Sequence, residues 1–181
     1  MKPALARRSF LKLGIFAAAL PFPALAQTAE STPERRLGFD NLHTGESVEL
    51  PYWIQGGYVP ESLTEINRVL RDHRTGQIAE IDTALLDLLH RVNAALGGER
   101  RFEVISGYRS PTSNQMLASH SSGVAKRSLH MEGKAIDIRV PGIALSDLRR
   151  TGLLLQAGGV GYYPGSNFVH LDVGRVRAWA G

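Results

Sequence analysis

The chain has 181 residues, of which 43% are hydrophobic and 21% are charged, and it contains no cysteine. This length and composition fit one ordinary globular domain and exclude a disordered or fibrous protein. The lack of cysteine excludes disulfides, thiolate metal ligands and a cysteine nucleophile.

The formal net charge of +4 is unevenly distributed. Four of the 21 basic residues lie in residues 1–26, which contain no acid, so the rest of the chain carries 17 basic and 17 acidic residues. A body without excess charge gives no reason to expect a nucleic-acid partner.

Residues 1–26 have the pattern of an export signal. A basic start is followed by an apolar stretch at residues 11–23 and by the small-residue run ALA at residues 24–26, which is typical of a cleavage site. The run RRSFLK at residues 7–12 closely resembles a twin-arginine signal, which predicts a periplasmic protein and the twin-arginine export machinery as a partner. The apolar stretch is short for a bilayer span and contains two prolines. An uncleaved membrane anchor is therefore the less favoured alternative, and no stable span is expected once the leader is removed.

Residues 27–36 are polar and are expected to form a linker, followed by a single domain at residues 37–181. Residues 36–58 predict two or three short strands, with His43 at a turn. The capping-box pattern at residues 62–65 predicts that a helix begins at Ser62. Residues 71–74 are interpreted as its solvated end.

A second helix is predicted from its cap, Asp82, to the glycines at residues 97–98. Four strands and two helices are expected in the rest of the chain: strand 102–106, a short helix and loop within 112–127, strand 134–140, helix 146–156, and a hairpin of 160–163 with 168–173. Together these elements predict an α+β fold in which helices flank a small antiparallel sheet.

Two of the predicted strands carry polar side chains opposite an apolar face. Asp137 alternates with isoleucines in one, and His170 and Asp172 alternate with Val and Leu in the other. Neighbouring antiparallel strands lie about 4.8 Å apart, so side chains from both can reach one ion. His130, seven residues before Asp137, can supply a third ligand. Two imidazoles and a carboxylate with an open fourth position predict a zinc site of His130, Asp137 and His170.

Asp172 has two interpretations. It lies two residues from His170 on the same face of the strand, so it can act as the general base or orient His170 through the other ring nitrogen. The spacing satisfies both roles. Asp172 is the first candidate for the base, and Glu132 is a weaker one.

Arg109 follows the run SGY at the end of a predicted strand. Its fork of donors suits a catalytic role, either binding a carboxylate or stabilising the oxyanion formed on attack at a peptide carbonyl. The alternative is an ion pair with a structural carboxylate.

The pattern S-x-H-x-x-G-x-A-x-D at residues 128–137, followed by a strand carrying His170, resembles the zinc D-alanyl-D-alanine peptidases and their Hedgehog-like fold. The run SGYRS at residues 106–110 is similar to the segment in which that clan has its substrate-orienting arginine. Within the clan the chain is most similar to the murein endopeptidase K (YcbK-like) branch. That closer similarity rests on the leader and on the runs NLHTGE at 41–46, LRDHR at 70–74 and FVHLD at 168–172.

The resemblance implies that His130, Asp137 and His170 bind zinc. It also implies hydrolysis of amide bonds in peptidoglycan stem peptides or their cross-links, in cell-wall remodelling. One residue departs from the clan: many members have an acid three residues before the last His, and here that residue is Asn167. The role of the base therefore falls on Asp172 by inference.

Two alternatives stay open. The chain can be a non-catalytic zinc-containing envelope module that binds wall peptide or a partner, which the missing acid favours slightly. It can also be a carboxypeptidase that acts on free stem-peptide ends. The length of the cleft decides whether the enzyme is a carboxypeptidase or an endopeptidase, and whether it accepts 3-3 or 4-3 cross-links. That length depends on loops that the sequence does not define.

Overall fold

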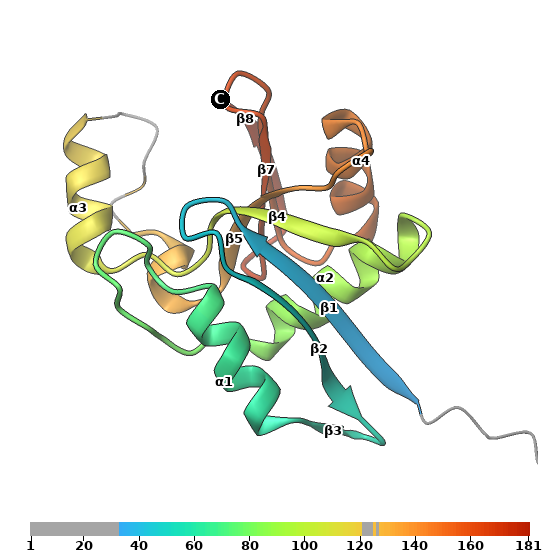
Figure 1. Ribbon diagram of the computed structural model, residues 1–181. Helices are drawn as coiled ribbons and strands as arrows, with labels where there is room; N and C mark the ends of the chain where they lie inside the picture. Colours follow the sequence, from blue (N-terminus) through green and yellow to red (C-terminus); the bar gives the residue numbers. More distant parts are fainter. Residues whose placement is uncertain (1–32, 121–124, 126) are drawn as a thin grey trace, which may run out of the picture. The chain divides into compact units, whose positions relative to one another are not determined.

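The computed structural model describes residues 33–120, 125 and 127–181. The predicted leader, residues 27–32 of the predicted linker and residues 121–124 and 126 of the predicted loop lie outside this part. The elements in chain order (Figure 1) are β1 Glu34–Asn41, β2 Ser47–Ile54, β3 Gly57–Tyr58, α1 Pro60–Val69, α2 Thr83–Ala95, β4 Arg101–Ser106, α3 Pro111–His120, the 3-10 helix η1 Leu129–Glu132, β5 Ala135–Arg139, α4 Leu145–Leu155, β6 Gly159–Tyr163, β7 Phe168–Asp172 and β8 Arg177–Ala180.

The described strands form one mixed sheet of eight, in the order β3-β2-β1-β4-β5-β7-β6-β8. Neighbours are antiparallel except for two parallel pairs, β1 with β4 and β6 with β8. The α+β class with flanking helices is confirmed. The sheet is larger than the sequence predicts, because β8 adds an edge strand after the final hairpin. β1 begins at Glu34, inside the segment expected to be a linker.

Two helix starts differ in how they are capped. α2 has the predicted cap: the Asp82 carboxylate accepts a hydrogen bond from the Ala84 amide at 2.9 Å. α1 begins before the predicted capping box, with Val59 at the N-cap and Pro60 in the first turn, so Ser62 lies buried inside the helix. The prediction of a start at Ser62 is wrong, because proline has the backbone angle of a first helical turn already fixed.

Three helices cover one face of the sheet. α1 packs on β2, α2 on β1, and α4 on β6 and β7, while α2 also contacts α4 (Figure 1). The core between these helices and the sheet includes Phe39, Phe102, Ile136 and Leu171, all with at most 1% of their surface exposed. The alternate side chains of β5 and β7 therefore point to the opposite face. None of the helices in the described part of the chain combines the length and hydropathy needed to span a bilayer.

Candidate metal centre

Three side chains converge on the sheet face away from the helices. Asp137 on β5 lies directly opposite His170 on β7, and η1 brings His130 beside both. His170 Nδ1 lies 2.8 Å from Asp137 Oδ1, while His130 Nε2 lies 3.3 Å from the same oxygen and 3.2 Å from His170 Nδ1. All three residues are buried. Tetrahedral zinc with bonds of about 2.0–2.1 Å needs donor atoms roughly 3.3 Å apart, so these separations fit a small cation.

The outer hydrogen bonds of the two histidines decide which ring nitrogens carry lone pairs. His130 Nδ1 lies 2.7 Å from the carbonyl oxygen of Gly107, which can only accept, so the proton is on Nδ1. His170 Nε2 lies 3.0 Å from the carboxylate of Asp172 and donates to it. The inner nitrogens and the Asp137 carboxylate are thus three acceptors that face one another. Such a group needs a cation between its members, and it could hold a metal ion.

The electrostatics of the group keep Asp137 ionised. Burial by itself raises the pKa of Asp137, but when the inner nitrogens of His130 and His170 are protonated in place of a bound cation, their charges and hydrogen bonds outweigh burial and lower the pKa of Asp137 below its usual range. A deprotonated carboxylate is the form in which aspartate binds a metal.

A tight turn holds His130 in position. Ser128 caps η1 and accepts a hydrogen bond from the His130 amide, and Gly133 ends η1 in the left-handed region at φ 66°. A Cβ at Gly133 would overlap the carbonyl oxygen of Glu80, and the Gly133 carbonyl accepts a hydrogen bond from the Asp82 amide. The glycine of the sequence pattern is therefore required by backbone angle and by close packing.

Asp172 lies behind His170 and does not line the cleft. It is fully buried, and its carboxylate accepts hydrogen bonds from His170, from the guanidinium of Arg177 on β8 at 2.6 Å, and from the amides of Gly159 and Gly174 at 2.9 Å each. Burial raises the pKa of Asp172, but these hydrogen bonds outweigh burial and lower it. The carboxylate is consequently held ionised with its acceptor positions filled.

Arg109 is buried beside the donor group, and its hydrogen bonds are long. One terminal nitrogen lies 3.3 Å from Ser106 Oγ and 3.5 Å from Asp137 Oδ2, and the other lies 3.5 Å from Asn114 Oδ1. Its Nε has no hydrogen-bond partner among the described residues. Arg109 thus retains donor capacity beside the candidate metal site.

A cleft of about 750 Å³ opens over the donor group. The three donor residues and Arg109 line it, together with the aromatic side chains Tyr163, Phe168 and Trp179 and with His43 and Arg74 from two loops. The indole of Trp179 on β8 donates to the Tyr163 hydroxyl at 2.8 Å, which fixes the aromatic side of the cleft. Trp179 and Arg74 are absent from the site that the sequence predicts, because β8 has only four residues and Arg74 lies in a loop.

The remaining candidate acids lie elsewhere. Glu132 pairs with Lys134 at 2.9 Å on the surface. Asn167, at the position of the clan's usual acid, lies in the β6–β7 turn at φ 55°. Neither residue lines the cleft, and Asp137 has the one acidic side chain among the described residues that do.

A buried His-Asp-His group at the floor of an open cleft defines a metal-dependent hydrolase. The family model described as Peptidoglycan L,D-endopeptidase MepK matches residues 29–179, and the chain belongs to this family of metallopeptidases. The chain is 46% identical over 176 residues to the Peptidoglycan L,D-endopeptidase MepK of Escherichia coli (strain K12), covering 96% of both chains. It is 41% identical over 180 residues to the Probable peptidoglycan L,D-endopeptidase MepK of Haemophilus influenzae, covering 97% of this chain and 96% of that one. No solved structure gives a significant match. The resemblance to the murein endopeptidase K branch is thereby confirmed.

Proposed function

We propose that this protein is a zinc-dependent L,D-endopeptidase that cleaves peptidoglycan cross-links, with His130, Asp137 and His170 as the zinc ligands. The observation that carries the proposal is the convergence of three buried acceptor atoms, separated by 2.8, 3.2 and 3.3 Å, beneath a cleft. The L,D specificity comes from the names of relatives that are 46% and 41% identical to the chain.

The choice of zinc follows from the donor set. Two imidazole nitrogens and one carboxylate oxygen suit zinc better than magnesium or calcium, which prefer oxygen ligands. Bound zinc supplies a Lewis acid and lowers the pKa of a coordinated water to near 7.

Arg109 is proposed to stabilise the negative charge that develops on the scissile carbonyl oxygen. Its guanidinium lies 3.5 Å from a carboxylate oxygen of Asp137, and its Nε has no partner among the described residues. A preorganised cation in a buried position stabilises a developing negative charge more than a cation in water does, because its surroundings need little reorganisation during the reaction.

Asp172 is proposed to orient His170 rather than to act as the general base. A base needs a free lone pair within reach of the substrate or of the attacking water. The Asp172 carboxylate is fully buried, accepts hydrogen bonds from His170 and Arg177, and lies outside the cleft lining. A carboxylate on the outer nitrogen fixes the ring and raises its basicity toward a metal.

Residues 1–26 are proposed to direct the protein to the periplasm through the twin-arginine machinery, with the segment before β1 as a connection and residues 34–181 as the catalytic domain. The paired arginines at residues 7 and 8 support this route. Replacement of both by lysine, followed by cell fractionation, tests it: the protein is expected to accumulate in the cytoplasm. Unchanged export would contradict the twin-arginine assignment.

One observation favours a second candidate function. Among the described residues that line the cleft no acidic side chain accompanies Asp137, which is the pattern of a module that binds wall peptide without cleaving it. Digestion of defined cross-linked muropeptide dimers by zinc-loaded protein, with products identified by mass spectrometry, separates the candidates. An endopeptidase gives two monomers, a carboxypeptidase releases a terminal amino acid, and a binding module leaves the dimer intact.

A further inference from the structure

Arg74 is a second arginine of the cleft. The sequence predicts a solvated helix end at residues 71–74, but Arg74 and His43 both line the cleft that opens over the donor group. Arg109 lines the same cleft. The two guanidinium groups therefore face one shared volume.

A buried carboxylate fixes the loop that carries Arg74. Asp72, 1% exposed, accepts hydrogen bonds from the Arg74 amide at 2.9 Å and from the Ser110 amide at 2.8 Å. Asp72 thus ties the turn that carries Arg74 to the segment that carries Arg109. On the other side of the loop the ring of His73 stacks on His43, with centroids 3.8 Å apart.

The loop places Arg74 where it has no carboxylate partner. The nearby Arg68 and Arg71 both pair with Glu46. Among the described residues the guanidinium of Arg74 forms no ion pair or hydrogen bond of its own. The fold therefore neutralises the neighbouring arginines and leaves this one available to a ligand.

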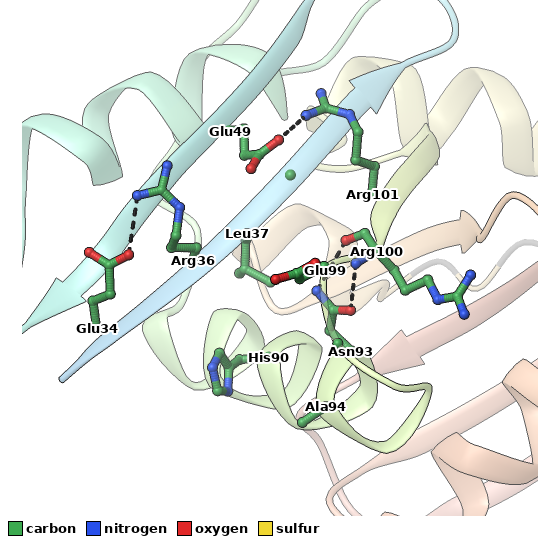
Figure 2. Close-up of a pocket in the computed structure, with 12 residues that line it drawn as sticks. Glu34, Arg36, Leu37, Glu49, His90, Asn93, Ala94, Glu99, Arg100 and Arg101 are labelled. Atoms are coloured by element: carbon green, nitrogen blue, oxygen red, sulfur yellow. Dashed lines mark hydrogen bonds and ion pairs between the residues drawn. The ribbon is translucent and has the colours of Figure 1, made fainter. Parts of the chain in front are cut away.

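A second hollow in the protein shows the opposite arrangement (Figure 2). It has a volume of about 540 Å³ and shares no lining residue with the cleft. Two of its three arginines are paired within the hollow, Arg36 with Glu34 at 3.3 Å and Arg101 with Glu49 at 2.8 Å (Figure 2). The third, Arg100, is balanced in number by Glu99, so the lining of this hollow carries no excess of positive charge.

The cleft as a whole has an excess of positive charge. Its described lining includes four arginines, at residues 74, 109, 127 and 177, and one acidic side chain, that of Asp137. Asp172 compensates Arg177 from behind. Since basic and acidic residues are equal in number after residue 26, this excess is local to the cleft. The complementary ligand is an anion.

We propose that Arg74, beside Arg109, forms a carboxylate-binding subsite that recognises a free carboxylate next to the scissile amide. The inference rests on the proposed function. In a cross-link between two stem peptides the acyl carboxyl is consumed in the amide, so the nearest free carboxylate is on the carbon that bears the scissile nitrogen. Arginine suits this group because its donors bind a carboxylate in a fork.

The test compares enzyme variants on two synthetic cross-linked peptide dimers, which carry either the carboxylate or a carboxamide on that carbon. Zinc-loaded wild type, Arg74→Gln and Arg74→Lys are measured, with Arg36→Gln as the matched control from the second hollow. For the carboxylate dimer, Arg74→Gln is expected to raise KM about tenfold while kcat changes less than about threefold, which corresponds to one lost charge-assisted hydrogen bond. Arg74→Lys recovers part of this loss. For the carboxamide dimer, wild type and Arg74→Gln have the same KM.

An equal rise of KM for both dimers in Arg74→Gln, or no rise for either, would overturn the subsite. If wild type cleaves neither dimer, the proposed function fails on its own. The subsite is then decided by calorimetric binding of the two dimers to the same zinc-loaded proteins. A preference for the carboxylate dimer that disappears in Arg74→Gln supports the subsite, and equal affinities in wild type overturn it.

Discussion

Asp137 and His170 lie directly opposite each other on the neighbouring strands β5 and β7, with Asp137 Oδ1 2.8 Å from His170 Nδ1. Both side chains project from the face of the sheet that the helices do not cover. A register slip of one residue would turn one of them into the core, so burial of the isoleucines on the other face fixes the pair. His130 joins the pair from a tight turn, and Asp172 supports it from behind.

Removal of one donor tests the metal site. His130→Ala is expected to weaken zinc binding by more than about 100-fold and to abolish hydrolysis. This loss exceeds the roughly 10- to 100-fold effect of removing a residue that only hydrogen-bonds to a metal ligand. Competition with a chelating dye measures the affinity. Lys134→Ala is the control: the Lys134 ammonium pairs with Glu132 at the surface, and this variant is expected to bind zinc as the wild type does. Full zinc affinity in His130→Ala would exclude His130 as a ligand.

Asp172→Asn distinguishes an orienting carboxylate from a general base. If Asp172 orients His170, zinc affinity falls about 10- to 100-fold and excess zinc restores much of the activity. If Asp172 is the base, zinc affinity stays the same and activity is lost even with zinc saturated. Zinc titrations followed by turnover measurements on the same samples decide between the two results.

Local patterns in the sequence predict the centre of the site well. Alternation along β5 and β7 places Asp137 and His170 on the polar face. The short spacing from His130 to Asp137 predicts a turn that keeps the two side chains close together. These relationships involve adjacent strands and a few residues of chain, so periodicity carries them.

Contacts between distant segments are not visible in such patterns. The position of Arg74 depends on the bond from Asp72 to the Ser110 amide, across 38 residues of sequence. The four residues of β8 are too few for a clear alternation, so Arg177 and Trp179 were not assigned to an edge strand. Choosing between the two roles of Asp172 likewise required its partners from β8 and from the Gly159 amide.

Gly133→Ala tests the turn that holds His130. A left-handed backbone angle and contact with the Glu80 carbonyl predict a loss of roughly 2 kcal/mol or more in the free energy of unfolding. Zinc affinity should fall with it, because the turn positions a ligand. Gly165→Ala is the control: it has open space around its Cβ and is expected to unfold at the same urea concentration as the wild type. A Gly133→Ala protein with wild-type stability would contradict the close packing.

The buried carboxylate of Asp72 is expected to make the folding stability depend on pH in the acid range. Burial raises the pKa of Asp72, but the nearby hydroxyls of Ser110 and Ser113 and the hydrogen bonds from the Ser110 and Arg74 amides lower it further than burial raises it. Because the pKa is lower in the folded than in the unfolded state, the stabilisation is present at neutral pH and is lost as the pH falls below about 4.

Urea unfolding at several pH values measures this effect. Asp72→Asn is expected to cost about 1–3 kcal/mol at pH 7, and its difference from wild type should shrink toward pH 3. Asp147→Asn, which removes an exposed pair with Arg150, is the control and should cost less than about 1 kcal/mol. A difference between Asp72→Asn and wild type that is constant over this pH range would contradict the assignment.

The central claim is that the His130, Asp137 and His170 group binds the zinc that cleavage of peptidoglycan cross-links requires. The most direct measurement follows conversion of a defined muropeptide dimer to monomers by wild-type protein stripped of metal and then titrated with zinc. The stripped protein is expected to give no conversion, and conversion is expected to rise with zinc to saturation at one ion per chain. Full conversion by the metal-free protein would contradict it.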